Sequence, residues 1–557
     1  MPLLAPSSMN KPLENPFYYL GNFHCVLEWI GERYSDLLEP QERAFIEQFS
    51  LLPQASQALF VRMVMRKGCL FRASKLCYAE IGNTHEAAQA LLQTGWIEND
   101  PLLRLDDLFN LLQKTELATI FRLSLHEKSA CKSAQLEALR PQYPGTFHFS
   151  TWYEHSGDHL YHMLSKPLCD RLRLIFFGNL RQDWSEFVLS DLGIHQYEKV
   201  EFSPTSRAFR TRRDIDDYLA LQRCRERFIG MGDTADLVRE LSDSAYASDW
   251  LASRRDRLLF HIGQHREKLK DWDGAFKLHA TCPYPGARIR AIRVLEKSGQ
   301  SAAAFEWLSR AQRAPESDAE CQQLSRIGPR LGRKLGHARF STAPVAPVCR
   351  LDVRLAWPSV PCSVEETVRR HLTCADAPVY YVENALINSL FGLLCWSAIF
   401  KALPGAFFHP FHRGPADLLR ADFQRRRAPE FARCLAELES EQYRGTIRRT
   451  YAEKFGIQSP FVFWDVVDQQ LIDLALSCIP ALHLKQWFER ILLDIKANRS
   501  GFPDLIQFWP AQQRYHMIEV KGPGDRLQDN QKRWIDFCAA RQMPITVCYL
   551  QWNEVDV

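Results

Sequence analysis

The chain has 557 residues and lacks the features that would direct it to a membrane, to export or to a zinc fold. Its N-terminus, MPLLAPSSMNKPLENPFYYL, has no basic segment followed by a continuous apolar core, so we expect no secretory signal. The most apolar run, residues 385–400, contains Asn388 and Ser389 and is shorter than the ~20 residues that cross a bilayer. We interpret it as a buried helix and expect no membrane partner.

Cysteine pairs and a strong net charge are also missing. None of the 16 cysteines forms a C-x-x-C pair, which argues against a zinc ribbon or finger. Without an export signal, we expect reduced thiols in a cytosolic compartment. The net charge is only +4, so any nucleic-acid surface must be a local patch that is balanced by acidic residues elsewhere. The length favours three or four domains of ordinary globular composition.

One basic stretch near the N-terminus contains no acidic residue. It is FVRMVMRKGCLFRASKL, residues 60–76, in which Arg62 and Arg66 are four positions apart and would share a helix face. Together with Lys67 they form either a solvated basic face or a phosphate-contacting helix of a small DNA-binding module. The segments AAQALLQTGWIE and DDLFNLLQKTELATIFR fit short helices of such a module, which would extend to about residue 140.

The middle of the chain has a helical pattern. Residues 225–340 contain short amphipathic helices, and the small and aromatic residues at 274–276 recur at 303–305. That spacing is close to the repeat length of a helix pair in a solenoid and predicts TPR-like helices. They would serve either as a scaffold or as a concave surface that faces DNA or a protein partner. Residues 338–362 are rich in Pro, Ala and Ser and predict a linker.

Residues 501–537 carry the pattern that points to chemistry. Asp504 begins an apolar run, residues 505–509, and a second run with β character covers residues 514–521. The two runs predict a hairpin. Side chains two apart on a strand share a face, so Glu519 and Lys521 would project together, and Asp504 could meet them from the neighbouring strand.

Two carboxylates and an ammonium group on one sheet suit a hard divalent cation and a scissile phosphate. Carboxylate oxygens are preferred ligands of Mg²⁺, and a lysine can orient the nucleophile or offset developing charge. The alternative is a surface hairpin with ordinary charges. Pro503-Asp504 is the only Pro-Asp pair in the chain, and its neighbours fit the geometry that the chemistry needs.

The residues after this hairpin predict a strand–helix–strand unit. Residues 522–524 would turn the chain, and Asp525 could cap a helix that extends to about Arg541. Gln531 is the polar member of the inner stripe of that helix, so we expect it to face the carboxylates. Residues 544–552 read as a further buried strand, and a unit of this size implies parallel pairing.

An additional acidic residue lies far upstream. VENALINSLFGLLCWSAIF, residues 382–400, reads as an apolar helix, with Glu383 on the same face as several leucines. An isolated glutamate on a buried face is costly unless it is paired or binds metal. A glutamate at a helix N-terminus can instead interact favourably with the helix dipole. The residues alone leave both interpretations open.

These segments resemble a known family. FPDLIQF…MIEVKGPGDRLQDNQKRW resembles the VRR-NUC domain of the PD-(D/E)xK nuclease superfamily, and VENALINSLFGLLCW looks like the family segment that carries an upstream metal-binding glutamate. The order of basic helix, SAP-like module, TPR-like helices and C-terminal nuclease resembles the Fanconi-associated nuclease family in a bacterial form. That form would be cytoplasmic and associated with the nucleoid.

The resemblance implies roles for particular residues. Asp504, Glu519 and Lys521 match the catalytic acid, acid and lysine of the family, Glu383 matches its helical glutamate, and the main-chain carbonyl of Val520 would be a metal ligand. The cation would be Mg²⁺ or Mn²⁺. The predicted catalytic residues are therefore Glu383, Asp504, Glu519, Lys521 and Gln531, the predicted metal ligands are Glu383, Asp504, Glu519 and Val520, and the predicted DNA-binding residues are Arg62, Arg66, Lys67 and Lys496.

The implied activity is hydrolysis of phosphodiester bonds in branched or flapped double-stranded DNA. It would combine 5′ flap endonuclease with 5′-to-3′ exonuclease activity of the phosphodiesterase I type, in DNA interstrand crosslink repair, with repair proteins as partners of the TPR-like helices. The alternatives are a Holliday-junction resolvase-like or restriction-like endonuclease and a non-catalytic DNA-binding scaffold. A resolvase normally acts as a symmetric dimer, whereas the long N-terminal half favours a monomer that reads branch shape.

The expected fold is multidomain. Mostly α-helical N-terminal and middle regions precede an α/β restriction-endonuclease-like nuclease domain. The predicted boundaries are an N-terminal helical region at 1–60, a SAP-like DNA-binding module at 61–140, a TPR-like helical region at 141–340, a linker at 341–365 and a VRR-NUC nuclease domain at 366–557.

Overall fold

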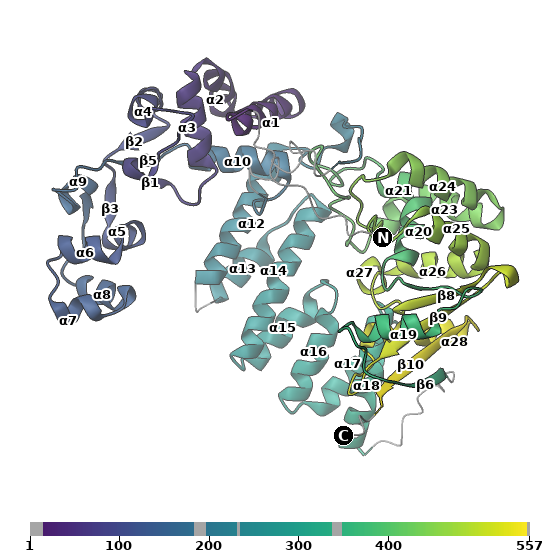
Figure 1. The fold of residues 1–557 in the computed structure, drawn as a ribbon. Helices are drawn as coiled ribbons and strands as arrows, with labels where there is room; N and C mark the ends of the chain where they lie inside the picture. Colours follow the sequence, from purple (N-terminus) through teal and green to yellow (C-terminus); the bar gives the residue numbers. More distant parts are fainter. Residues whose placement is uncertain (1–14, 183–195, 231–233, 337–347, 554–557) are drawn as a thin grey trace. The chain divides into compact units, whose positions relative to one another are not determined.

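The computed structural model of the chain describes residues 15–182, 196–230, 234–336 and 348–553 (Figure 1). The chain divides into two compact units. The first comprises residues 1–195 and 209–215, and the second comprises residues 196–208 and 216–557. No helix in the described ranges is long and apolar enough to cross a membrane.

The first unit combines helices with short strands. Strands β1, β5 and β2 form an antiparallel sheet in that order, and β3 pairs with β4. An aromatic cluster fills the core beside the larger sheet, where the ring centroids of Phe45 and Trp96 are 4.5 Å apart. The elements are α1 (Tyr18–Tyr34), α2 (Pro40–Leu51), α3 (Gln54–Val64), β1 (Leu70–Arg72), η1 (Ala73–Lys75), α4 (Thr84–Gln93), β2 (Ile97–Asn99), β3 (Leu102–Arg104), α5 (Leu105–Leu111), α6 (Lys114–Ile120), α7 (Leu125–Ser129), α8 (Lys132–Leu139), β4 (Thr146–His148), α9 (Phe149–Trp152), β5 (Leu160–Met163) and α10 (Lys166–Phe177).

Stacked helices form the first part of the second unit. Ala275 and Ala304, which recur at the predicted spacing, are both fully buried between neighbouring helices. Gly274 is closely surrounded, because a Cβ there would lie 2.2 Å from the Asp271 carboxylate and would force that side chain to move. The elements are η2 (Pro204–Ser206), α12 (Arg212–Gly230, which starts in the first unit), α13 (Ala235–Asp243), α14 (Asp249–Lys268), α15 (Trp272–Thr281), α16 (Ala287–Lys297), α17 (Ser301–Arg313) and α18 (Asp318–Lys334).

A five-stranded sheet of order β6-β10-β9-β8-β7 forms the centre of the C-terminal part. The predicted hairpin is confirmed, because β8 and β9 are antiparallel and end at the predicted residues. The parallel pairing of β9 with β10 is confirmed too. The strands are β6 (Cys349–Leu355), β7 (Val379–Tyr381), β8 (Leu505–Trp509), β9 (Arg514–Lys521) and β10 (Ile545–Trp552).

Helices pack against this sheet and bury a large apolar core. The apolar run 385–400 is buried as predicted, but it forms two helices, α20 and α21, which meet at Cys395. The helices are α19 (Val364–Leu372), α20 (Leu386–Leu394), α21 (Trp396–Ile399), α22 (Phe423–Arg426), α23 (Ala428–Ala436), η3 (Glu437–Glu439), α24 (Gln442–Lys454), α25 (Gln469–Cys478), α26 (Ala481–Leu493), α27 (Ile495–Asn498), η4 (Pro510–Gln512) and α28 (Asp529–Ala540).

The predicted linker at 341–365 is wrong over its described part. Residues 341–347 lie outside the described ranges, but Cys349–Leu355 forms β6, which pairs in parallel with β10, and α19 begins at Val364. β6 lies at the edge of the sheet, and Val353 is its one fully buried side chain. An edge strand with so little apolar content looks like a linker in sequence. The nuclease sheet therefore begins before residue 366.

Candidate nuclease site

The hairpin β8–β9 brings the predicted carboxylates to one end of the sheet. Asp504 immediately precedes β8, and Glu519 and Lys521 lie near the end of β9. The antiparallel register pairs Leu505 with Ile518, so Asp504 lies beside the last residues of β9. Its Oδ2 accepts a hydrogen bond of 2.8 Å from the Val520 backbone N–H.

Glu519 is a fully buried carboxylate with very few partners. It has no exposed surface, and apart from the ion pair with Lys521 neither of its carboxylate oxygens has a hydrogen-bond partner. Its one close cation is the Lys521 ammonium, 2.6 Å from Oε1. Burial and the negative charge of Asp504 raise the pKa of Glu519, Lys521 opposes both effects, and the resulting pKa is about 7. A buried carboxylate without donors is costly unless another group compensates its charge.

Asp504 shares this environment. Burial raises its pKa to about 6, although the Val520 N–H and the Lys521 charge act in the opposite direction. The charges of Glu365 and Glu383 add to the increase in the pKa of Asp504, so four carboxylates act on one another at this end of the sheet. Strong perturbation of several acids by burial and by like charge is typical of functional sites.

Glu383 does not lie on a buried helix face, and that prediction is wrong. It is exposed and lies in the turn between β7 and α20, with a backbone φ of 26°. The backbone N–H groups of Val382 and Glu383 both donate to the carbonyl oxygen of Asp504, at 2.9 and 3.0 Å. β7 pairs with β8 as far as Tyr381, and the chain then turns sharply before the helix can start. These backbone hydrogen bonds nevertheless tie the turn to Asp504, and the negative charge of Glu383 acts on both Asp504 and Glu519.

The role predicted for Gln531 is also not supported by its position. α28 begins at Asp529, and Gln531 Oε1 accepts a hydrogen bond of 2.8 Å from the Gln528 backbone N–H in a capping box. Asp525 does not cap this helix. Its Oδ2 accepts a hydrogen bond of 3.0 Å from the Gly522 N–H and closes the preceding turn. The turn lengthens the connection after β9, so the helix starts later than the pattern predicted.

The predicted DNA-binding residues differ in their surroundings. α3 ends at Val64, so residues 60–76 form a helix, a turn, β1 and η1 and not one basic helix. Arg62 is engaged within the unit: its Nε donates to Glu80 Oε1 at 3.0 Å, and its guanidinium lies 3.9 Å from the centre of the Tyr19 ring. Arg66 and Lys67 are exposed in the turn. Lys496 is exposed on α27, shortly before Asp504.

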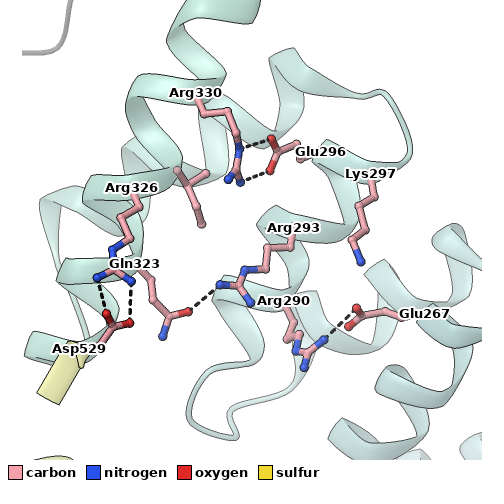
Figure 2. Close-up of a pocket in the computed structure, with 10 residues that line it drawn as sticks. Glu267, Arg290, Arg293, Glu296, Lys297, Gln323, Arg326, Arg330 and Asp529 are labelled. Carbon is pink, nitrogen blue, oxygen red and sulfur yellow. Dashed lines mark hydrogen bonds and ion pairs between the residues drawn. The ribbon is translucent and has the colours of Figure 1, made fainter. Parts of the chain in front are cut away.

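A cavity of about 620 Å³ lies in the second unit, away from the carboxylates (Figure 2). Figure 2 shows Arg326 of α18 facing Asp529, where two hydrogen bonds of 2.5 and 2.6 Å connect the TPR-like helices to α28. Asp529 follows Lys521 closely in the chain, so this contact is next to the connection that leaves the site. The lining residues are Glu267, Arg290, Arg293, Glu296, Lys297, Gln323, Arg326, Ile327, Arg330 and Asp529.

Sequence reasoning missed two partners of Glu383 and one further acid that acts on Asp504. Tyr381 donates to Glu383 Oε2 at 2.6 Å, and Asn384 Nδ2 donates to Oε1 at 3.0 Å. The side-chain oxygen of Asn384 also accepts from the backbone N–H of Gly501, at 2.7 Å. Glu365, at the start of α19, acts electrostatically on Asp504. Asn384 and Tyr381 could have been suspected as polar neighbours of Glu383, but Glu365 had no signal of its own.

The donor set fits a divalent cation. Among the residues that the structure describes, no three His, Cys, Asp or Glu side chains converge closely enough to form a complete metal site. However, Glu519 presents two buried carboxylate oxygens whose one close partner among the described residues is Lys521, with Asp504 beside it. Carboxylate oxygens are the ligands of hard cations such as Mg²⁺. A cation there would compensate a buried charge that the protein compensates only through Lys521.

Comparison with known proteins identifies the family. A Fanconi-associated nuclease 1 homolog from Pseudomonas aeruginosa is 56% identical over 99% of this chain and 99% of its own length. A crystal structure of paFAN1 bound to a 2-nucleotide 5′ flap DNA with a gap is 55% identical, covers 98% of this chain and 100% of that chain, and superposes with a TM-score of 0.89. The chain belongs to the Fanconi-associated nuclease family.

Members of the Fanconi-associated nuclease family with much lower identity match over the full chain as well. Fanconi-associated nuclease 1 of Homo sapiens is 23% identical over 99% of this chain and 64% of its own length. Family models match three regions: FAN1, HTH domain, at residues 17–98; Fanconi anemia-associated nuclease SAP domain at 102–152; and VRR-NUC domain at 438–552. The SAP match starts well after residue 61, so the first part of the predicted SAP-like module lies within the HTH match.

The protein is therefore a DNA nuclease, and VRR-NUC nucleases depend on divalent metal ions. Asp504, Glu519 and Lys521 lie within the VRR-NUC match at 438–552, whereas Glu383 lies before it. The fold class predicted from the sequence is confirmed: helical N-terminal and middle regions precede the C-terminal α/β nuclease domain.

Proposed function

We propose that this protein is a structure-selective nuclease that cuts flapped and branched double-stranded DNA, as a 5′ flap endonuclease and a 5′-to-3′ exonuclease of the phosphodiesterase I type. The observation that carries the catalytic part is the buried carboxylate of Glu519, which lies beside Asp504 and has Lys521 as its close partner. The preference for flaps is supported by the relative of known structure, which was crystallised with 5′ flap DNA.

The roles of the residues follow from their chemistry. Asp504, Glu519, the carbonyl of Val520 and Glu383 would hold Mg²⁺ or Mn²⁺. Such a cation supplies Lewis-acid stabilisation of the negative charge that develops at the phosphate. Lys521 offsets developing charge and orients the attacking water. Water adds to phosphorus, the bond from phosphorus to the leaving oxygen breaks, and one phosphate end and one hydroxyl end result.

DNA binding would rest on phosphate contacts, which give affinity without base specificity. Arg66 and Lys67 in the turn after α3 and Lys496 beside the site are exposed cations suited to such contacts. Arg62 is less suited, because it is paired with Glu80. We further propose a cytoplasmic, nucleoid-associated role in interstrand crosslink repair, with repair proteins binding the TPR-like helices.

The first prediction tests the reaction on a labelled duplex with a 5′ flap. The wild-type protein cuts near the flap in Mg²⁺ or Mn²⁺ and not in EDTA. Asp504→Ala abolishes cleavage but keeps most DNA affinity, because phosphate contacts lie elsewhere. Asp236→Ala is the matched control, since the Asp236 side chain is 86% exposed on α13 and should leave cleavage unchanged. Wild-type rates in Asp504→Ala would remove Asp504 from the site.

Substrate shape separates this function from its alternatives. A nicked duplex, a 5′ flap and a four-way junction should be compared at equal concentration, with the flap cut fastest. Paired symmetric cuts in the four-way junction would favour a resolvase, for which a dimer is expected. In cells that lack the protein, the wild-type gene and not the Asp504→Ala gene should restore survival after treatment with a bifunctional crosslinking agent.

A further inference from the structure

The backbone at Glu383 is held firmly, but its side chain needs separate support. The N–H groups of Val382 and Glu383 share the Asp504 carbonyl oxygen, and the φ of 26° at Glu383 is a strained conformation for a residue other than glycine. These contacts fix the position of the Glu383 backbone, but they do not fix the three torsion angles of its side chain. An exposed glutamate that must hold a ligand loses rotamer freedom, which weakens binding unless neighbouring groups already restrict the side chain.

Two donors hold the two carboxylate oxygens of Glu383. The Tyr381 hydroxyl donates to Oε2 at 2.6 Å, and the Asn384 side-chain amide donates to Oε1 at 3.0 Å. Tyr381 is the last residue of β7 and pairs with Leu505, which follows Asp504. The Tyr381 hydroxyl therefore belongs to β7, the strand that also lies beside Asp504. Each carboxylate oxygen retains lone pairs, since one donor does not use the full acceptor capacity of an oxygen.

The Tyr381 side chain is not part of the hydrophobic core. It is 47% exposed, so its position is not explained by burial of the ring. The preceding residue, Tyr380, is half-buried and packs its ring against Phe508, with centroids 6.1 Å apart. A tyrosine hydroxyl is protonated at neutral pH, so the Tyr381 hydroxyl can donate the hydrogen bond to Glu383 Oε2.

We propose that Tyr381 is a positioning residue that orients the Glu383 carboxylate for a divalent cation, through the hydrogen bond between its hydroxyl and Oε2. This inference rests on the proposed function, because it assumes that Glu383 is a cation ligand. Partners of this kind around metal ligands limit the rotation of the ligand before the cation arrives, and their loss typically costs about 10- to 100-fold in metal affinity or activity.

The test compares Tyr381→Phe with Tyr380→Phe. Both variants lose one hydroxyl from neighbouring residues of β7, but only Tyr381 donates to Glu383. Mn²⁺ affinity, measured by isothermal titration calorimetry without DNA, should fall about 10-fold or more in Tyr381→Phe and stay unchanged in Tyr380→Phe. The Mg²⁺ concentration for half-maximal flap cleavage should rise by a similar factor. At saturating Mg²⁺ the rate should recover, and the KM for DNA should not change.

A rescue variant distinguishes the hydrogen bond from a general structural effect. Tyr381→His keeps an aromatic ring and an N–H donor, so it should recover part of the Mn²⁺ affinity that Tyr381→Phe loses. Melting temperatures of the two Tyr381 variants should stay close to that of the wild type, because the Tyr381 side chain is 47% exposed. Mn²⁺ affinity in Tyr381→Phe within twofold of the wild type would overturn the role of Tyr381. If the wild-type protein itself failed to cut flapped DNA in any divalent metal, the proposed function would fail instead.

Discussion

At the scale of single residues, the site is defined by charge that is poorly compensated. Glu519 has no exposed surface, and its only close cation is Lys521. Replacing water around a carboxylate with apolar neighbours disfavours the charged form. The buried charge of Glu519 thus lowers the stability of the fold but favours the binding of a cation. Such a conflict between stability and function is common at functional sites.

The second prediction follows from the pKa of Glu519. Its value of about 7 in the folded protein lies above the ordinary value of 4.5, so the folded state holds a proton that the unfolded state has lost between these values. The preference of the folded protein for protonated Glu519 therefore contributes fully to the free energy of unfolding below about pH 4.5, and this contribution is lost as the pH rises through 7. In EDTA, Glu519→Gln should stabilise the protein at pH 8, by about 3 kcal/mol for a shift of this size, and change little at pH 4.5.

Melting temperatures at the two pH values check this expectation, and flap cleavage by Glu519→Gln should be abolished. The matched control is Glu306→Gln, because the Glu306 side chain is 64% exposed on α17. A destabilised Glu519→Gln at pH 8 would mean that the ion pair with Lys521 outweighs the cost of burial.

At the scale of secondary-structure elements, local patterns predicted the strands of the site well. The alternation in residues 505–509 and 514–521 is a property of the strands themselves, so β8 and β9 could be read directly. β6 could not, because an exposed edge strand has little apolar signal and is recognised only through its pairing with β10. Glu383 was misplaced because periodicity does not reveal where a helix starts, whereas the turn at Glu383 is set by Asp504, which is distant in sequence.

The start of α28 gives the third prediction, because it assigns Gln531 to a helix cap and not to catalysis. Gln531→Ala removes the acceptor for the Gln528 N–H and should cost about 0.5–2 kcal/mol of stability, the usual range for a lost cap. Flap cleavage below the melting transition should stay near the wild-type rate. Gln531→Glu keeps a carbonyl-type acceptor and should retain stability. A loss of cleavage in Gln531→Ala without a loss of stability would restore the catalytic role that its position in the sequence suggested.

At the scale of the whole molecule, positive charge is divided between structural and available cations. The net charge of +4 hides this division, because many arginines are paired within the protein. In the second unit, Arg326 is paired with Asp529. In the first unit, Arg62 is paired with Glu80, whereas Arg66 and Lys67 are exposed in the turn after α3. Sequence reasoning could find the acid-free stretch but not this division, because Glu80 lies outside the stretch and meets Arg62 only in the folded unit.

The last prediction separates the two kinds of cation by salt dependence. The logarithm of the DNA-binding constant falls linearly with the logarithm of the salt concentration. Each phosphate contact that is lost should reduce the magnitude of this slope by about 0.9 on duplex DNA. Arg66→Ala with Lys67→Ala should therefore reduce the magnitude of the slope by about 1.8 in total if both residues contact phosphates. The melting temperature should fall only slightly, because the hydrogen bond of 3.0 Å that Arg66 donates to the Lys75 carbonyl oxygen is exposed. The matched control is Arg239→Ala with Lys277→Ala, which removes two exposed cations from the second unit, where the side chains are 74% and 73% exposed. This pair should leave the slope near the wild-type value.

Arg62→Ala should affect the melting temperature more, and the salt slope less, than Arg66→Ala with Lys67→Ala. It leaves the Glu80 carboxylate, which is only 13% exposed, without its partner and removes the guanidinium from the Tyr19 ring. The melting temperature should fall, because a poorly exposed charge loses its partner. The salt slope should change by less than in Arg66→Ala with Lys67→Ala, since a cation that is already paired releases few counterions. An equal loss of slope in Arg62→Ala, with no loss of stability, would mean that Arg62 leaves Glu80 to bind phosphate, and the stretch would then act as one DNA-binding surface.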